Sequence, residues 1–482
     1  MRKLADLLPD VQLQEHQQRL ADEAAREPLR KLLVHALGSG KSLTAIAAAE
    51  SRGEPYTAIT PAALRPNFQK EQSKFTDQSL PSEVFSYSQL AGGKTPTHLG
   101  SLILDEAHRI RNPLTQSSQQ AQRAALQAKQ LIMLTGTPIV NEPSDLATPI
   151  SMLTRRQITP AEFTNRYVRY KKVEPNLFER LFSNEKPRVD TEIAHEAELR
   201  ALLKGHVDWH SPDHPIVPTH REDIPTEMSP EQTNLYKAMW NQLPYTMRWK
   251  LQNDFPLTSG ELKNATNFLT GPRQVALSTY PYMATKDPMK AFNQSTKLTK
   301  AHEELHKHLK DPRSKALVFS NFIDAGLTPY AAALEQSGIP HGVFHGGLND
   351  AQRKKLVEDY NTGKSRVALL GPSGTEGLSF KGTQLIQILD PYWNPIRGKQ
   401  SEGRGMRFDS HTDLPPELQN VKIQRYLSRL PLGFKNNLLD AIGMDREKHR
   451  HATDDYLVTM ANRKEKLNSR FMDLLKEVGT QR

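Results

Sequence analysis

One stretch near the N-terminus constrains the fold more than any other. The letters LLVHALGSGKSLTAIAAAE, residues 32–50, run from an aliphatic segment through a glycine-containing loop into an alanine-rich segment. This order predicts a buried strand, a tight loop and a helix. Gly38 and Gly40 allow the backbone amides of the loop to turn inward around a phosphate. The stretch therefore predicts an α/β fold with a phosphate-binding loop beyond a strand end.

The residues that follow the glycines are of the types that bind a nucleotide. Lys41 can reach the β- and γ-phosphates, and Ser42 can ligate Mg²⁺. The N-terminus of the following helix adds a positive dipole end. His35 stands where the strict phosphate-loop pattern has its first glycine, so a loop that only begins a helix is the alternative. The succession of strand, loop and helix favours phosphate binding.

A second stretch, LILDEAHRIRN at residues 102–112, ends an aliphatic run in two adjacent carboxylates. A strand that merely stops at the surface is the simplest interpretation. In a parallel sheet, however, ligands bind beyond the carboxyl ends of the strands. Asp105 would then lie next to a Mg²⁺ ion held by Ser42, and Glu106 would orient and deprotonate the attacking water. The two stretches together predict an enzyme that hydrolyses a nucleoside triphosphate.

Composition narrows the class of protein. The 482 residues suffice for two or three domains, and no cysteine is present, which excludes disulfides, thiolate zinc sites and cysteine nucleophiles. There is no apolar run of about 18 residues, the length that a membrane helix needs. The basic N-terminus lacks the apolar core of a secretory signal, so we expect a cytoplasmic protein, bacterial or of a phage-infected cell, or a nuclear one if eukaryotic.

The charge balance points to a polyanionic partner. Lysine and arginine number 64 against 54 acidic residues, which gives a net charge of +10. Nucleic acid is the first candidate for such a partner, although a merely basic protein would have the same balance.

Aliphatic runs divide the chain into two α/β sections separated by a polar, helical-looking region. Expected strands of the first section are residues 32–34, 57–60, 102–104 and 131–134; those of the second are 316–319, 367–370 and 385–389. A strand-like THREDIPTEM and a helix-like PEQTNLYKAMW lie between the sections. Near the C-terminus, Leu467, Phe471, Leu474 and Val478 recur at helical spacing, which predicts a packing stripe.

Several segments resemble, in the same order, the motifs of helicase superfamily two and its Swi/Snf-like DNA translocases. The matching segments are LQEHQ at 13–17, ALGSGKS at 36–42, PAALRPNFQKE at 61–71, DEAHRIRN at 105–112, LTGTPIVN at 134–141, ALVFSNF at 316–322, FHGGLNDAQRKKLVEDYN at 344–361, LDPYWNP at 389–395 and QSEGRGMR at 400–407. The C-terminal part resembles the branch carried by large DNA viruses and phages.

This resemblance implies a fold and a set of site residues. The implied fold is α/β, two RecA-like lobes with ATP and Mg²⁺ in the cleft between them, a helical insertion and a helical C-terminal segment. Arg404 and Arg407 would reach the γ-phosphate, which suits guanidinium stabilisation of phosphoryl transfer. The implied nucleotide contacts are Gln17, Gly38, Ser39, Gly40, Lys41, Ser42 and Gln400. The implied coupling residues are His108, Thr135, Thr137 and Glu376, with His108 a residue of the cleft and not a zinc ligand.

The resemblance also implies sequence-independent contacts with a nucleic-acid backbone. The expected contact residues are Pro61, Arg65, Ser320, Asn321, Gly374, Thr375 and Trp393, although for Trp393 packing is the stronger alternative. The segment GPSGTEGLSF at 371–380 departs from the family pattern, with Glu376 and Ser379 in place of other residues.

The expected domains are residues 1–245, with a helical protrusion at about 147–218, a linker or protrusion at 246–295, a second lobe at 296–430 and a helical segment at 431–482. The leading hypothesis is an ATP-driven translocase on double-stranded DNA. The alternatives are a strand-separating DNA or RNA helicase and an ATP-switched accessory subunit that docks on a protein partner through its insertion or C-terminal segment.

Overall fold

The chain folds into two compact units, each built around a parallel sheet. The computed structural model describes residues 12–36, 39–173, 188–211, 217–252, 269–372, 378, 380–391, 410–411, 414–431 and 452–480. The first unit comprises residues 1–213 and 464–482, and the second comprises residues 214–463. Each unit holds a six-stranded sheet. The expected pair of α/β lobes is thereby confirmed.

The first sheet contains all four strands predicted for it and two more. Its order is β3 (Ser82–Ser86), β2 (Tyr56–Thr60), β4 (Ser101–Leu104), β5 (Gln130–Thr135), β1 (Arg30–His35) and β8 (Val207–His210). Every neighbouring pair is parallel. The carboxyl ends of all six strands therefore lie along one edge of the sheet.

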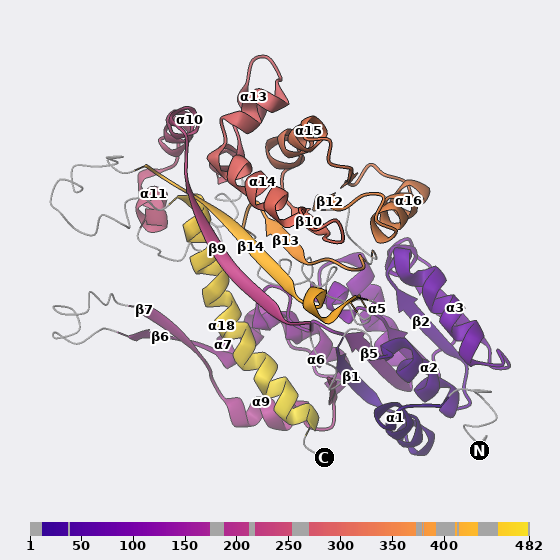
Figure 1. Cartoon of the computed structure of the whole chain (residues 1–482). Helices are drawn as coiled ribbons and strands as arrows, with labels where there is room; N and C mark the ends of the chain where they lie inside the picture. Colours follow the sequence, from indigo (N-terminus) through magenta and orange to yellow (C-terminus); the bar gives the residue numbers. More distant parts are fainter. Residues whose placement is uncertain are drawn as a thin grey trace. The chain divides into compact units, whose positions relative to one another are not determined.

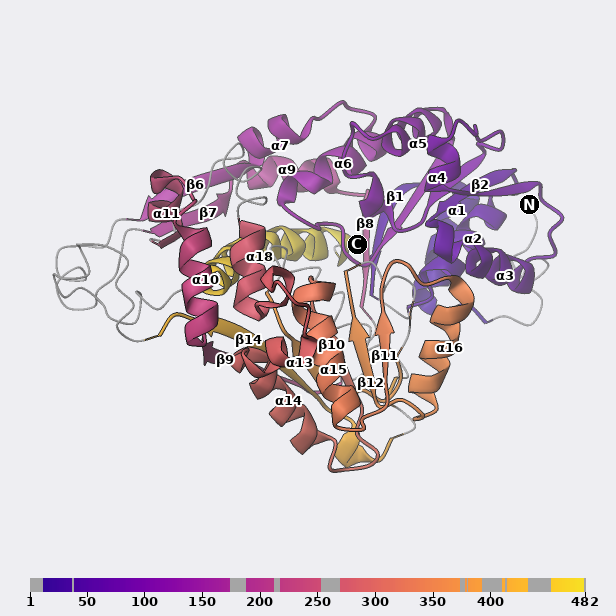
Figure 2. The same cartoon turned by 90° about the horizontal axis from the view of Figure 1, so that it is seen from above.

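Helices cover both faces of this sheet, which is why its central strands carry apolar residues on both faces (Figure 2). One face packs against α1 (Glu15–Arg26), α2 (Lys41–Ser51) and α3 (Arg65–Phe75). The other packs against α4 (Tyr87–Ala91), α5 (Gln116–Gln127), α6 (Ala147–Thr154) and the C-terminal part of α18 (Thr453–Thr480). The predicted stripe of Leu467, Phe471, Leu474 and Val478 is confirmed, because all four residues are buried in this core.

The segment expected to be a helical protrusion, about 147–218, combines helices with strands. After α6 come α7 (Pro160–Tyr167), β6 (Val168–Val173), β7 (Arg188–Ile193), α9 (Glu196–Leu203) and the edge strand β8. Strands β6 and β7 pair antiparallel as a separate two-stranded sheet. Their many charged residues conceal a period of two, which is the reason that sequence reasoning did not find them.

The second sheet has the order β11 (His341–Phe344), β12 (Val367–Leu370), β10 (Ala316–Phe319), β13 (Leu385–Ile388), β14 (Val421–Arg429) and β9 (Thr219–Glu227). All its pairs are also parallel. The long strands β9 and β14 lie side by side over nine residue pairs (Figure 1). Strand β9 therefore belongs to the second unit, although a boundary at residue 245 would assign it to the first.

Helices of the second unit form two layers and a smaller cluster. Helices in the described part of this unit include α10 (Pro230–Trp240), α11 (Tyr245–Gln252), α13 (Pro288–Asn293), α14 (Thr296–His308), α15 (Thr328–Gln336) and α16 (Asp350–Asn361), and residues 269–277 are helical as well. Helices α13, α14 and α15 cover one face of the sheet, and α16 covers the other. Helices α10 and α11 pack with the beginning of α18 in a separate apolar cluster.

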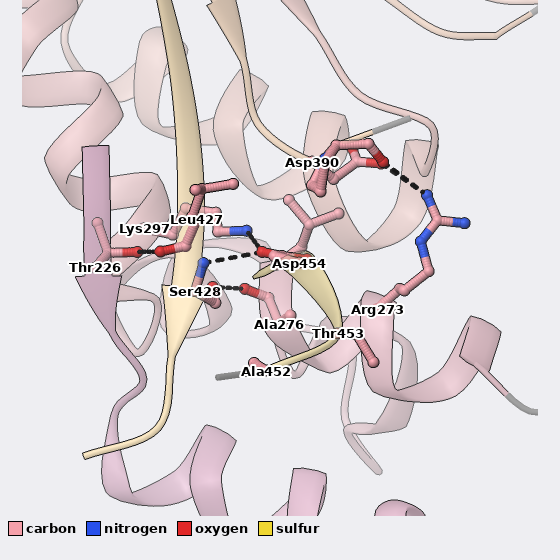
Figure 3. A network of polar contacts seen from close by, with 12 residues as sticks. Thr226, Arg273, Ala276, Lys297, Asp390, Leu427, Ser428, Ala452, Thr453 and Asp454 are labelled. Atoms are coloured by element: carbon pink, nitrogen blue, oxygen red, sulfur yellow. Dashed lines mark hydrogen bonds and ion pairs between the residues drawn. The ribbon is translucent and has the colours of Figure 1, made fainter. Parts of the chain in front are cut away.

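A buried ion pair fixes the beginning of α18 in the second unit (Figure 3). Lys297 Nζ on α14 lies 2.6 Å from Asp454 Oδ2, and both side chains are almost completely buried. The same carboxylate accepts a hydrogen bond from the backbone N–H of Ser428 on β14 at 2.9 Å.

Among the helices in the described part of the chain, none is both long and apolar enough to cross a membrane.

Candidate active site

The loop between β1 and α2 has the close backbone approach that its glycines predict. Gly40 has a φ of +72°, and a Cβ at this position would lie 2.5 Å from Gln17 Nε2. Only glycine meets both constraints without strain. Gln17 on α1 is buried, and its Nε2 donates to the Gly40 carbonyl at 3.4 Å. The structure thus brings Gln17 to the loop, and its contact with a nucleotide stays a prediction.

Lys41 begins helix α2 and turns its ammonium back over the loop. Its Nζ donates to the carbonyls of His35 at 3.0 Å and Ala36 at 3.2 Å. Ser42 lies in the same first helical turn. A Cβ on Gly136, just beyond β5, would lie 3.6 Å from Lys41 Nζ. The ends of β1 and β5 therefore meet at this lysine.

The histidine that replaces the first glycine has partners of its own. His35 is completely buried, and its Nε2 lies 2.8 Å from Asp208 Oδ1 on β8. Asp208 also forms an ion pair with Arg19 on α1. His16 stacks on His210 with 3.6 Å between ring centroids, and His16 Nε2 lies 3.3 Å from the Ser39 carbonyl. Helix α1 and strand β8 thus hold the loop from two sides.

Burial and neighbouring groups set the protonation states of Asp208 and His16. Burial raises the pKa of Asp208, but the bonds from His35 and Arg19 outweigh burial and leave that pKa below its ordinary value. Burial, together with the neighbouring His210 and His35, lowers the pKa of His16 to about 4. Asp208 is therefore ionised and His16 neutral near pH 7.

The two carboxylates follow β4 at the same edge of the sheet. The backbone N–H of Asp105 extends the sheet by donating to the Ile59 carbonyl on β2 at 2.8 Å. Burial, and then the charge of Glu106, raise the pKa of Asp105 to about 7. Glu106 has a φ of +49°, and its backbone N–H donates to Asp105 Oδ1 at 3.0 Å.

A histidine links these carboxylates to the end of β5. His108 Nδ1 lies 3.3 Å from Glu106 Oε2 and 3.3 Å from Thr135 Oγ1. The backbone N–H of Thr137 donates to the same threonine hydroxyl at 3.0 Å. The structure therefore brings together three of the four expected coupling residues, around the carboxylate expected to act as a base.

These residues fit a nucleotide with Mg²⁺. A hard divalent cation takes oxygen ligands, and Mg²⁺ in phosphate-transfer sites commonly uses one or two carboxylates together with substrate phosphates. No group of three or more histidine or carboxylate side chains suited to a metal occurs in the described residues, so the protein builds no closed metal cage there. A cation beside Asp105 would favour the ionised carboxylate, which burial and Glu106 otherwise oppose.

Two of the expected nucleic-acid contacts lie at the end of β2. Pro61 follows this strand and is buried, and Arg65 begins α3. Arg65 donates from a terminal guanidinium nitrogen to Gln89 Oε1 on α4 at 3.3 Å. Contact of these residues with a polymer stays a prediction.

Two more expected contacts, Ser320 and Asn321, follow β10 in the second unit and share a partner. Ser320 Oγ donates to Asp390 Oδ1 at 2.7 Å, and Asn321 Nδ2 donates to Asp390 Oδ2 at 2.5 Å. Arg273 approaches the same carboxylate, at 3.4 Å (Figure 3). Ser320 is 1% exposed, so its hydroxyl is engaged inside the unit. Any contact of the two with a polymer stays a prediction.

Sequence reasoning did not single out Asp208 or Asp390. Asp390 follows β13 after one intervening residue, Leu389, so it resembles Asp105, the residue directly after β4. Asp208 carried no such signal, since its strand was not predicted.

The remaining expected site residues lie outside the described residues: Gly38, Gly374, Thr375, Glu376, Trp393, Gln400, Arg404 and Arg407.

Two family models match the chain in succession. Residues 86–275 match the SNF2-related domain, and residues 296–409 match the helicase conserved C-terminal domain. The first match contains the quoted segments at 105–112 and 134–141, and the second contains those from 316 to 407.

Curated relatives with similarity along nearly the whole chain come from large DNA viruses. A protein of Acanthamoeba polyphaga mimivirus, named as an ATP-dependent RNA helicase (L538), is 25% identical over an alignment of 456 positions, which covers 92% of each chain. A termination factor NPH-I homolog of African swine fever virus is 23% identical over an alignment of 558 positions, which covers 93% of this chain and 75% of the relative's own length. The solved Sulfolobus solfataricus SWI2/SNF2 ATPase core in complex with dsDNA covers 97% of this chain and 98% of its own at 18% identity, with a TM-score of 0.36.

The SNF2-related match includes Asp105, Glu106 and Thr135, and the phosphate loop precedes it in the chain. The chain belongs to the Swi/Snf-like branch of helicase superfamily two, with two RecA-like lobes, and it is an ATP hydrolase.

Proposed function

We propose that this protein couples ATP hydrolysis to movement along double-stranded DNA. The observation that carries the proposal is the convergence of Lys41, Glu106 and Thr135 at one edge of the first sheet, with His108 between the latter two. Such an arrangement can relay a change at the nucleotide to the segment after β5. A motor needs this relay, whereas a simple phosphatase does not.

Each residue has a separate role in the proposed hydrolysis. Lys41 binds the phosphates, and Asp105 with Ser42 holds the cation that accompanies them. Glu106 accepts the proton of the attacking water, and His108 keeps the Glu106 carboxylate turned toward it. A bound Mg²⁺ would neutralise the charge that develops on the phosphates. Arg404 and Arg407 are proposed to add positive charge to the γ-phosphate.

The proposed polymer is duplex DNA, held through its backbone. The net charge of +10 favours a polyanion, and family membership favours a motor that moves without reading bases. Contacts to phosphates supply affinity and position, whereas base contacts supply sequence specificity. On duplex DNA, each neutralised phosphate should contribute roughly −0.9 to the logarithmic salt slope of binding.

Two other functions are supported by the names of relatives. The mimivirus relative is named as an RNA helicase, which favours a strand-separating enzyme that acts on RNA. The African swine fever virus relative is named as a termination factor homolog, which favours an ATP-driven subunit that works with a transcribing complex.

Steady-state ATP hydrolysis without polymer, and with single-stranded DNA, duplex DNA or RNA, separates these functions. The proposal predicts the largest stimulation with duplex DNA of any sequence. Stimulation by RNA with strand separation would support the helicase. Equal rates under all four conditions, with stimulation only by a protein partner, would support the accessory subunit.

A further inference from the structure

The peptide unit between the two catalytic carboxylates is held in an unfavourable conformation. Glu106 has a φ of +49° and a ψ of 51°, in the left-handed region. A residue with a side chain adopts this region at a cost in free energy, and it persists only where the surroundings hold it. The direction of the Glu106 side chain follows from this conformation.

Both polar groups of this peptide unit have a partner. The Asp105 carbonyl oxygen accepts a hydrogen bond from the hydroxyl of Tyr87 at 2.7 Å. The Glu106 N–H donates to Asp105 Oδ1 at 3.0 Å. Tyr87 is only 7% exposed, so water cannot readily replace its hydroxyl. The plane of the peptide, and with it the turn at Glu106, is therefore fixed from both ends.

The Tyr87 hydroxyl is a dependable donor in this position. Burial, followed by the charges of Asp105 and Glu106, raises the pKa of Tyr87 well above its ordinary value. The hydroxyl therefore keeps its proton throughout the neutral range.

The helix that carries Tyr87 is hydrogen-bonded to Arg65, one of the expected nucleic-acid contacts. Tyr87 begins α4, and Ser86 and Gln89 form a reciprocal capping box at its start. Gln89 Oε1 accepts from the Ser86 N–H at 3.0 Å and from the Arg65 guanidinium at 3.3 Å. A single side-chain oxygen thus joins the helix start to Arg65.

We propose that Tyr87 is a positioning residue for ATP hydrolysis, which holds the Asp105–Glu106 peptide so that the Glu106 carboxylate faces the attacking water. We further propose that Gln89 couples this position to polymer binding at Arg65. The second part rests on the proposed function, whereas the first part requires only ATP hydrolysis.

The alternative is that Tyr87 merely satisfies a buried carbonyl. In that case its hydroxyl would affect stability and nothing else. Tyr330 provides the comparison, because it is also buried and its hydroxyl donates to Gln387 Oε1 at 2.8 Å within the second unit, whereas Asp105 and Glu106 belong to the first.

The test compares Tyr87→Phe with Tyr330→Phe and the parent enzyme. For Tyr87→Phe we expect unchanged ATP affinity and a turnover number lower by on the order of 10-fold to 100-fold, the scale of small misplacements in active sites. Tyr330→Phe should keep the parent turnover, with a similar decrease in unfolding temperature. Equal turnover of the two variants would overturn the positioning role.

A second pair of variants keeps the proposal testable if Tyr87→Phe does not fold. Gln89→Ala removes the side-chain oxygen that accepts from the Ser86 N–H and from Arg65, whereas Gln89→Glu keeps an acceptor for both. We expect turnover to fall in Gln89→Ala and to recover in Gln89→Glu, and parent-like turnover of Gln89→Ala would contradict the proposal. If no polymer stimulates the parent, the proposed function fails, and the basal rates of the Tyr87 variant still decide the positioning role.

Discussion

His35 Nε2, at the end of β1, lies 2.8 Å from Asp208 Oδ1 on the neighbouring strand β8. The same carboxylate pairs with Arg19 on α1, and the His35 carbonyl accepts a hydrogen bond from Lys41. The replacement of the first loop glycine by histidine thus adds a link between α1, β8 and the phosphate loop.

Asp208→Asn is expected to weaken ATP binding and to leave turnover at saturation nearly unchanged. Hydrogen bonds to charged groups contribute about 1.5–3 kcal/mol. A loss of about 1.4 kcal/mol in the free energy of ATP binding would lower the affinity tenfold. Calorimetric titration of nucleotide measures the effect. Glu54→Gln is the control, since Glu54 pairs with Lys129 and Arg52 and not with any loop residue. Equal affinities of the two variants would argue against a role of Asp208 in the loop.

Acid should destabilise the first unit through His16. Its pKa is about 4 in the folded protein, against an ordinary value of 6.5. Between these values the unfolded chain binds more protons than the folded one, so stability rises with pH across the window. The contribution of neutral His16 to the free energy of unfolding is complete above about pH 6.5 and is lost as the pH falls toward 4.

Denaturant unfolding at several pH values checks this expectation. His16→Gln should flatten the dependence on pH, although His35, His210, Asp208 and Arg19 remain around the site. The same replacement at the exposed His220 is the control. An unchanged slope in His16→Gln would show that His16 does not contribute.

Lys41→Ala should abolish tight ATP binding, and Glu106→Gln should retain binding but stop turnover. The reason is that Lys41 lies on the phosphate loop, whereas Glu106 faces His108 beyond β4. Losses of general-base and electrostatic groups cost about 10²–10⁴ in rate. Nucleotide affinity and steady-state hydrolysis are to be measured for both variants. Near-normal turnover of Glu106→Gln would exclude it as the base.

The strands that carry the site could be predicted because burial on both faces leaves an unbroken aliphatic run. LIL before Asp105 and LIML before Thr135 are such runs, and both became central strands. Asp105 and Glu106 could be predicted for the same reason, since charges that follow a buried strand directly lie at a sheet edge.

The remaining features depend on contacts between distant segments. Strand β14 carries charges among its buried residues, and its pairing with β13 and with β9 shows that β14 and β9 belong to the second sheet. Tyr87 and Asp208 lie 18 and 173 residues from their partners Asp105 and His35. No local pattern signals such pairs, so only the folded chain reveals them.

Asp454→Ala should destabilise the second unit strongly. Its carboxylate is the partner of Lys297 in a pair with exposed side-chain fractions of 1% and 0%. Breaking a buried pair costs about 3–5 kcal/mol, because one charge is left uncompensated. Exposed pairs contribute about 0–1 kcal/mol, so Glu303→Ala, which removes an exposed partner of Lys300, is the control. Denaturant unfolding should separate the two variants, and equal stabilities would contradict the expectation.

The most direct test of DNA translocation is ATP-dependent displacement of a third strand from duplex DNA. We expect the parent enzyme to release the third strand only with hydrolysable ATP and irrespective of duplex sequence. Arg407→Ala should bind ATP and DNA yet release no strand, because removal of an arginine finger costs roughly 10³–10⁵ in turnover. Failure of the parent to release the strand, with hydrolysis stimulated by RNA and not by duplex DNA, would contradict the account.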